Sequence, residues 1–275
     1  MLRPLSLIKK LSVFLLVYVS ANTAGAQVYN SSVSAATGGT GRAAVEPGDA
    51  SFLNPATLVH LGGRYLFTSF AKNEFAAALS DNTKESTIPA SFSYMQKSSQ
   101  MTLLGDLKEN DLAISLAEFV VDKWSVGLSG HYLTQDLPTS SYHTVNADFG
   151  VLYTPIPEIG LGLVGYNLFG QNNDAPEELR RKTTVAAGFN YIYKSMVRFR
   201  LDADSESVVG VGLETFLNRF IVTRFGYSDD LNDTRSLLSA GLGFSGPRFR
   251  LNYAYVGNVQ KSSDYRHSVD LIIPF

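Results

Sequence analysis

Strict alternation of apolar and polar residues is the feature that most constrains how this chain folds. From Arg64 onward the dominant period is two, which places successive side chains on opposite faces of an extended strand. The last nine residues follow the same rule, with Val269, Leu271, Ile273 and Phe275 on one face. The same alternation recurs in 145–154, 185–193, 197–204, 238–245 and 249–255. The pattern predicts a chain made almost wholly of β-strands.

Fourteen strands are expected, with twelve as the alternative because the first three are short. Most of the later strands are close to the ~9–11 residues with which a tilted strand crosses a membrane. The expected strands are 64–71, 74–80, 88–95, 111–120, 123–134, 142–154, 160–169, 180–192, 195–203, 207–216, 219–228, 235–245, 247–257 and 264–275.

The connections between these strands alternate in length. Long connections, expected outside the cell, are 96–110, 135–141, 170–179, 229–234 and 258–263. Short connections, expected in the periplasm, are 121–122, 155–159, 194, 217–218 and 246. Such asymmetry is typical of outer-membrane β-barrels. Two connections depart from it, since 81–87 is long for a turn and 204–206 is short for a loop.

The N-terminus, residues 1–26, has the features of a secretory signal peptide. Three basic residues precede an apolar run, 11–19, that is shorter than the ~20 residues of a membrane-spanning helix. Ala26 ends an Ala-x-Ala cleavage pattern, so the mature chain is expected to begin at Gln27. An uncleaved anchor is the alternative, but nothing apolar extends the run past Ser20.

Composition excludes several classes of protein. The chain has no cysteine, so disulfides and thiolate metal sites are absent. Without the signal peptide, 20 basic residues stand against 25 acidic ones, which leaves no basic excess for nucleic acid. The content of 14 Tyr, 17 Phe and 23 Gly suits a membrane barrel with aromatic girdles.

A large soluble β-sandwich would show the same alternation, so periodicity alone does not decide between the two architectures. The signal peptide, the terminal Phe275 and the alternating connections favour an antiparallel transmembrane β-barrel over residues 63–275. Such a barrel must close, because unpaired backbone groups are not tolerated in lipid. The last strand is therefore expected to pair with the first, 64–71.

Residues 27–62 do not alternate and are expected to form a hatch inside the barrel. Their glycines and other small residues permit close backbone packing, and Asn54-Pro55 marks a turn. The glycine-rich run 38–42 is not expected to bind a nucleotide, because a phosphate loop also needs a preceding strand and a Lys-Ser/Thr pair. No cofactor is expected.

In this segment the chain resembles the FadL-type outer-membrane transporters of the OMPP1/FadL/TodX superfamily. Their hatch carries a Gly-x-Gly-Arg-Ala run, an Asp-Ala or similar pair, and Asn-Pro-Ala before the first barrel strand. The matching positions here are Gly39, Gly41, Arg42, Asp49, Asn54 and Pro55. The resemblance implies a 14-stranded barrel that takes up hydrophobic molecules such as fatty acids. The chain departs from the family in being short, with 96–110 as its only sizeable external excursion.

A catalytic or metal site would be an alternative to a channel. None of the four histidines has metal-ligand spacing. Ser129 and His131 share one face of a strand that Asp148 could approach from a neighbour, but residues at i and i+2 seldom hold attack geometry. No enzyme activity and no metal are expected, and a polar lumen is the preferred interpretation.

Alternation also places charged residues inside the barrel. One interpretation is a network of paired charges that ties down the hatch, in which Glu46 or Asp49 meets an arginine, because unpaired buried charges are costly. The sharper alternative is a track that binds a carboxylate head group. The expected lumen charges are Asp148, Arg198, Arg200, Asp202, Glu214, Arg248, Arg250 and Asp270.

Pro89 falls within an expected strand and cannot donate a hydrogen bond to its neighbours. In the resembled family an early strand kinks and opens a lateral hole, so one hypothesis is that Pro89 marks such an opening. The alternative is a strand that begins at Ala90. The apolar residues expected to line the route are Phe52, Leu53, Phe92 and Tyr94.

Together these features predict an outer-membrane channel for passive uptake of small hydrophobic molecules by hatch displacement and lateral exit. Two alternatives stay open: a structural or secretion-associated barrel that binds a protein partner, and a lipid-modifying barrel enzyme. The expected partners are outer-membrane lipid, a hydrophobic ligand, and the barrel-assembly machinery, which would recognise the C-terminal strand ending in Phe275.

Overall fold

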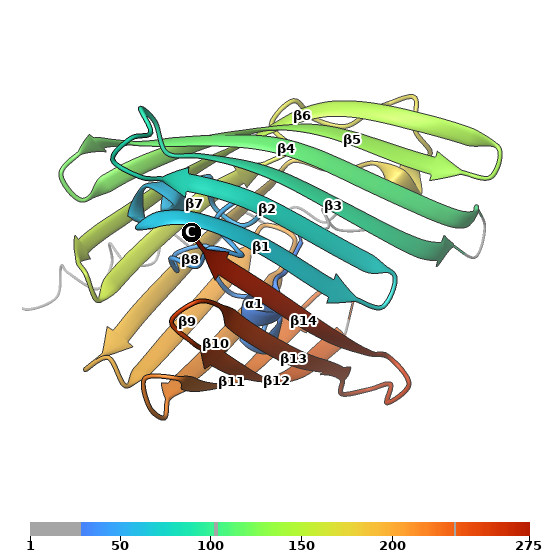
Figure 1. Cartoon of the computed structure of the whole chain (residues 1–275). Coiled ribbons are helices and arrows are strands. Elements are labelled where there is room, and N and C mark those ends of the chain that lie inside the picture. Colours follow the sequence, from blue (N-terminus) through green and yellow to red (C-terminus); the bar gives the residue numbers. More distant parts are fainter. Residues whose placement is uncertain (1–28, 102–103, 234) are drawn as a thin grey trace, which may run out of the picture.

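The computed structural model describes residues 29–101, 104–233 and 235–275, so the expected signal peptide lies outside the described residues. Fourteen antiparallel strands form a closed barrel in sequence order (Figure 1). They are β1 (Gly63–Ala71), β2 (Glu74–Asn82), β3 (Ala90–Met101), β4 (Gly105–Val121), β5 (Trp124–Leu137), β6 (Ser140–Ile156), β7 (Ile159–Tyr166), β8 (Thr184–Tyr193), β9 (Val197–Asp204), β10 (Val208–Phe216), β11 (Ile221–Asp230), β12 (Arg235–Ser245), β13 (Arg250–Asn258) and β14 (Tyr265–Pro274).

The last strand closes the barrel onto the first, as the sequence predicts. The β1–β14 register runs from Tyr65 opposite Pro274 to Ala71 opposite Ser268. Val269 is exposed on the outer face while Asp270 is fully buried on the inner face. The exterior of the described strands carries many exposed Leu, Val, Ile and Phe side chains, which is the surface that a lipid-facing wall requires.

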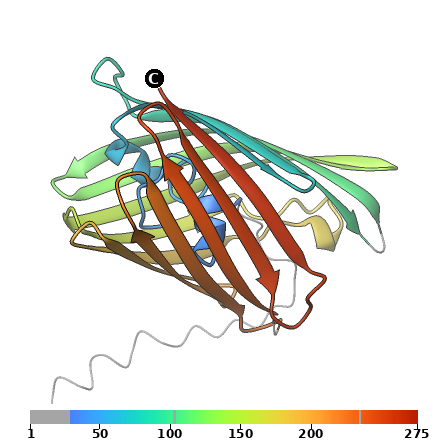
Figure 2. The same cartoon turned by 60° about the horizontal axis from the view of Figure 1, so that its bottom comes forward.

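Residues 29–62 lie inside the barrel, where Figures 1 and 2 show them in blue. They contain a one-turn helix, α1 (Ser32–Ala36), and a 3-10 helix, η2 (Pro55–His60). The segment that these residues form is called the hatch below. α1 packs mainly on β11–β13, and η2 packs on β4–β6. Within the described residues no helix is long and apolar enough to span a membrane.

The expectation of a long loop at 96–110 is wrong. Most of these residues extend β3 and β4, which pair without interruption from Ala90 opposite Leu116 to Met101 opposite Gly105. Their outward side chains are polar and exposed, as at Asp106 and Lys108, so this part of the hairpin lacks the apolar exterior that the sequence pattern was expected to continue. In Figure 1 the β3–β6 wall extends well beyond β1 and β14 on the right.

The longest connection between strands in the described residues is instead 167–183, between β7 and β8, which contains the short 3-10 helix η3 (Glu177–Leu179). It folds back against the extended wall, where Leu179 and Ala175 pack on Leu107. We call this connection the lid loop, and the end of the barrel that carries it the loop end.

Candidate functional site

The wall around the hatch is lined with glycines where the two backbones meet. A Cβ atom on Gly226 would lie 2.1 Å from the nitrogen of Gly38, and one on Gly210 would lie 2.2 Å from the Gly38 oxygen. On the opposite wall, a Cβ on Gly162 would lie 2.3 Å from the oxygen of Arg42. No side chain fits at such distances, so the hatch touches the wall backbone to backbone.

Buried ion pairs connect the hatch to β9, β10 and β11. Glu214 forms ion pairs with Arg200, with Arg224 at 2.7 Å and with Arg198 at 3.3 Å. Glu46 of the hatch in turn contacts Arg198 and, at 3.3 Å, Arg200. Paired buried charges of this kind are costly to break from one side. This is the expected network that ties down the hatch, and Arg224 is a member that the sequence reasoning missed.

Two further lumen carboxylates hold the hatch backbone. Asp202 accepts hydrogen bonds from the backbone nitrogens of Gly41 (2.8 Å) and Arg42 (2.9 Å). Asp270 accepts one from the Ser32 nitrogen at 2.6 Å and another from the Ser32 hydroxyl at 2.7 Å. Charged acceptors of backbone amides are strong hydrogen-bond partners, so these aspartates fix the path of the hatch.

The hatch motif residues have structural roles in this network. Asn54 caps η2 by accepting from the nitrogen of Ala56 at 3.0 Å, and its amide donates to the Arg42 oxygen at 2.7 Å. Pro55 occupies the first helical position, which its fixed φ suits. Gly39 has a φ of 74°, a left-handed conformation that favours glycine.

Asp49 is the least well paired of the motif residues. Its carboxylate is 1% exposed and lies 3.9 Å from the Arg200 guanidinium, beyond hydrogen-bonding distance. Burial raises the pKa of Asp49 to about 7, although the charge of Arg200 opposes the shift. The hatch therefore contains a carboxyl group whose charge is sensitive to pH near neutrality.

A cavity lies beside the hatch, toward the loop end of β3–β7, and is called the chamber below. Its free space for the centres of water-sized molecules is about 40 Å³, against the ~10–15 Å³ that one water needs and the ~150 Å³ of a cavity that binds benzene. The chamber thus has room for a few waters in this conformation. It is lined by Tyr29, Phe52, Ser93, Met95, Asp111, Ala113, His131, Asp148, Tyr166, Asn167 and Arg181.

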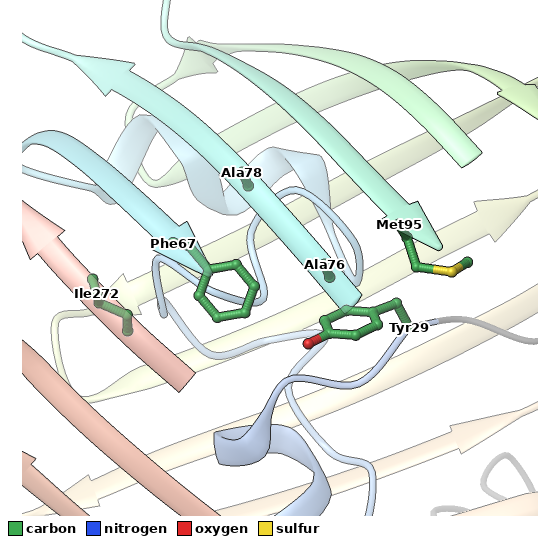
Figure 3. Packing of buried hydrophobic residues seen from close by; sticks show 6 residues of the cluster. All are labelled: Tyr29, Phe67, Ala76, Ala78, Met95 and Ile272. Carbon is green, nitrogen blue, oxygen red and sulfur yellow. The ribbon is translucent and has the colours of Figure 1, made fainter. Parts of the chain in front are cut away.

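Aromatic side chains of the hatch occupy one side of the chamber. The rings of Tyr29 and Phe52 lie 4.6 Å apart between centroids. Figure 3 shows Tyr29 packed beneath β2, near Phe67 of β1 and Met95 of β3. These side chains take up space that a ring-shaped ligand would need, so they control how large the chamber is.

The other side of the chamber is polar. His131 lies between two aspartates, with Nδ1 3.2 Å from Asp111 and Nε2 2.9 Å from Asp148. Arg181 reaches in from the lid loop and donates to Asp111 at 2.9 Å. The backbone nitrogen of Asn167 donates to Asp148 at 2.8 Å. Cross-strand register places these groups together. His131 of β5 lies two residues from Leu133, which is opposite Asp111 of β4, and two residues from Ser129, which is opposite Asp148 of β6.

The arrangement does not form a nucleophile–base site. The Ser129 hydroxyl is hydrogen-bonded to Ser115 at 2.7 Å rather than to His131. Both nitrogens of the imidazole face carboxylates instead. Among the described residues, no group of three or more His, Asp and Glu side chains is arranged to hold a metal ion.

Two of the four expected lining residues point the other way. Phe92 is 48% exposed on the outer face and Tyr94 lies on the same face, while Ser93 and Met95 point inward. Phe52 does line the chamber, whereas Leu53 is fully buried within the hatch. The error has a simple cause: on a strand whose serines face the lumen, the aromatic neighbours must face lipid.

The hypothesis of a wall opening at Pro89 is also wrong. β3 begins at Ala90, which pairs with Asp81 of β2 and with Leu116 of β4. Pro89 precedes the strand, and its oxygen accepts a hydrogen bond from the Ala117 nitrogen at 3.0 Å. A proline at this position interrupts no ladder, so the wall is continuous there.

One expected lumen charge lies outside the lumen. Arg248 is exposed in the turn between β12 and β13, because the latter strand begins only at Arg250. Arg250 itself is half-buried and makes no ion pair with any other described residue. Arg181, which the sequence reasoning missed, is a buried cation of the chamber. It lies within the expected strand 180–192, but β8 begins only at Thr184, so Arg181 belongs to the lid loop.

Comparison with solved structures identifies the fold. The chain is similar to the CymD monoaromatic hydrocarbon channel, with 14% identity, a TM-score of 0.69, and coverage of 92% of this chain and 99% of that one. The Ralstonia pickettii toluene transporter TbuX gives 15% identity and a TM-score of 0.64, covering 89% and 97%. A Pseudomonas aeruginosa FadL homologue has 11% identity and a TM-score of 0.68, with coverage of 92% of this chain and 100% of that one.

These similarities establish the architecture. The closed 14-stranded barrel of this chain has the fold of FadL-type channel structures along nearly its whole length. No protein-family model matches the sequence, and no curated protein is significantly similar to it. At identities this low the sequences have diverged far, so the properties of the site must be argued from the residues themselves.

Proposed function

We propose that this chain is an outer-membrane channel for the passive uptake of small hydrophobic molecules. The observation that carries the proposal is the chamber: an aromatic-walled space beside an anchored hatch, inside a closed barrel with an apolar exterior. The shared fold supports it, because similar structures are described as channels for monoaromatic hydrocarbons and toluene. Fatty acids, which the sequence resemblance implies, are a second ligand class to test.

Passage requires a local movement of the hatch rather than its expulsion. The glycine contacts and buried ion pairs hold residues 36–46 and 54–56 against the wall. Tyr29 and Phe52 are held mainly by ring packing, with Tyr29 on Phe67 and Met95. Displacement of these two rings would enlarge the chamber. Exit sideways into the membrane would require neighbouring strands to separate, since the described barrel is closed.

The proposal includes location and assembly. The expected signal peptide leads the chain to the periplasm, and the apolar exterior then matches the outer membrane. The terminal strand, which ends at Phe275 and pairs with β1, is the segment that the assembly machinery would recognise. No catalytic step is proposed, because Ser129 is bonded away from His131.

The test is uptake of radiolabelled toluene and oleate by Gram-negative host cells that lack a channel of their own. We expect cells that produce this chain to accumulate toluene several-fold faster than cells that do not. Ala113→Phe should abolish the gain, because Ala113 is buried against the chamber. Ile114→Phe is the matched control, since Ile114 follows Ala113 in the strand but is 58% exposed on the outer face.

Folding of both variants is checked by the heat-dependent shift in gel mobility that intact barrels show. If a folded Ala113→Phe barrel takes up toluene as fast as the unaltered protein, the chamber is not the route. If the unaltered protein gives no gain with either compound, the uptake proposal itself fails, and a barrel that serves a protein partner becomes the better explanation.

A further inference from the structure

The chamber has two chemically different sides, and this division has a consequence for its ligand. Tyr29, Phe52 and Met95 form an apolar side, while Asp111, His131 and Asp148 form a polar one. The polar side lies inside the barrel, since Asp111 and Asp148 are 9% and 8% exposed. A purely apolar ligand would fill the first side and cover the second, removing water from charged groups without replacing its hydrogen bonds.

The charges of the polar side determine which head group it accepts. Asp111 and Asp148 both face His131, whose two nitrogens lie 3.2 Å and 2.9 Å from their carboxylates. The remaining cation, Arg181, is already engaged by Asp111 at 2.9 Å and by Glu109 at 3.4 Å. A ligand carboxylate would therefore meet two carboxylates and no free cation among the described chamber residues, and like charges repel strongly at such a site.

A neutral donor fits where an anion does not. A carboxylate oxygen has room for two acceptor directions, and each aspartate here contributes two oxygens to the site. A hydroxyl that donates to Asp148 or Asp111 makes a charge-assisted hydrogen bond, which is stronger than one between neutral groups. The ring of such a molecule would lie against Phe52 and Met95, where aromatic and sulfur contacts are favourable.

Size sets the remaining limit. The chamber's present volume of about 40 Å³ is too small for a six-membered ring. A ring enters only if Tyr29 withdraws, and the tyrosine side chain is itself a phenol of the size in question. A long acyl chain would need the same movement and would still bring a carboxylate to the polar side.

We propose that the chamber selects small neutral aromatic molecules that carry a hydroxyl group, in preference to plain hydrocarbons and to carboxylates. The proposal rests on the uptake function above and names its substrate class. Asp111, His131 and Asp148 are the specificity-determining residues. Each aspartate already receives two donors, but each carboxylate oxygen can accept a second hydrogen bond, and Asp148 is the acceptor that is not paired with Arg181.

Three ligands of one shape test the proposal on the unaltered protein: p-cresol, p-xylene, in which a methyl group replaces the hydroxyl, and p-toluate, which has a carboxylate there. Equilibrium dialysis against the full chain in lipid nanodiscs, with empty nanodiscs subtracted, gives the three affinities. We expect p-cresol to bind about tenfold more tightly than p-xylene, and p-toluate to bind most weakly. Equal affinity for p-cresol and p-xylene, or tightest binding of p-toluate, overturns the proposal.

Two variants locate the effect. Asp148→Asn should weaken p-cresol binding about tenfold while p-xylene changes less than about twofold, because only the charged acceptor is lost. Asp122→Asn, in the exposed β4–β5 turn, is the control that should change neither. Tyr29→Ala should strengthen binding of both neutral ligands, because it removes the ring that fills the chamber. An equal loss of both ligands in Asp148→Asn would contradict selection by the hydroxyl.

Uptake by cells separates the two proposals. If p-xylene and p-cresol enter cells equally fast, and both faster than in cells without the protein, uptake stands and hydroxyl selection is wrong. If none of the three compounds binds or enters faster, both proposals fail together.

Discussion

The two halves of the lumen differ in how they use buried charge. Along β9–β11, Glu214 and three arginines connect to Glu46 of the hatch. Along β4–β6, Asp111, His131 and Asp148 connect to Arg181 of the lid loop and leave space between themselves and the hatch. The first network joins wall to hatch and the second joins wall to lid, which explains why the chamber lies in the second half.

The two charge networks have different roles. The hatch is held on both walls, with the ion network on β9–β11 and η2 on β4–β6, so the part that can move is the ring pair of Tyr29 and Phe52 at the chamber. The glycines do not follow this division. Gly210 and Gly226 meet the hatch at residues 37–38, and Gly127 and Gly150 meet it as closely at residues 54–56 on the β5–β6 wall. At the chamber, side chains rather than backbone separate wall from hatch, and side chains can change conformation at small cost.

The largest effect is expected from Glu214→Ala. This change leaves Arg198, Arg200 and Arg224 close together without their shared carboxylate, and breaking a buried ion network from one side costs about 3–5 kcal/mol. Urea unfolding in detergent should show that loss, and protease should cut the hatch. Glu85→Ala, at an exposed ion pair with Arg64, is the control that should leave both unchanged. A hatch that stays protected in folded Glu214→Ala would mean that the glycine contacts and the hydrogen bonds to Asp202 and Asp270 suffice to anchor it.

A smaller loss is expected from Gly226→Ala. The new Cβ would lie 2.1 Å from the Gly38 nitrogen and 2.3 Å from the Thr37 carbonyl carbon, both backbone atoms. Overpacking of this kind costs about 1–3 kcal/mol. Urea unfolding and protease cleavage of the hatch measure this loss as well. Gly130→Ala is the matched control, because a Cβ atom on Gly130 would have nothing within 4 Å. If the two variants unfold at the same urea concentration, close backbone contact does not fix the hatch.

The smallest effect concerns pH. Burial raises the pKa of Asp49 to about 7, above its ordinary value of 3.8, so the docked hatch favours the protonated form. This contribution is complete below the ordinary pKa and is lost as pH rises through about 7. Amide exchange of hatch residues, corrected for intrinsic rates, should show more protection at pH 5 than at pH 8. Asp49→Asn should remove that difference, and its persistence in the variant would assign the pH effect to another group.

Much of the architecture could be predicted because alternation is a local property. The closure of β14 onto β1 follows from the need to pair every backbone group in lipid. The inward charges Arg198, Arg200, Asp202, Glu214 and Asp270 follow from which face each residue occupies. The same rule, applied consistently, would have placed Phe92 and Tyr94 outside. The loop expected at 96–110 shows its limit, since polar outward residues mark the end of the lipid band and not the end of a strand.

The chamber could not be predicted in this way. Alternation lets Asp148 approach His131, but Asp111 joins them through cross-strand register. Arg181 belongs to the expected strand 180–192, whereas β8 begins only at Thr184 and Arg181 reaches the chamber from the lid loop. Arg224 likewise enters the ion network because β11 lies beside β10.

The sequence by itself determined the strands and the faces of their residues, because a period of two is set residue by residue. Together with the N-terminal signal and the alternating connection lengths, that pattern favoured a barrel with residues 27–62 as its hatch. Only the tertiary structure decided where the hatch is fixed and where space remains. Those outcomes depend on register and on the folding back of the lid loop, which bring together groups that are far apart in the chain.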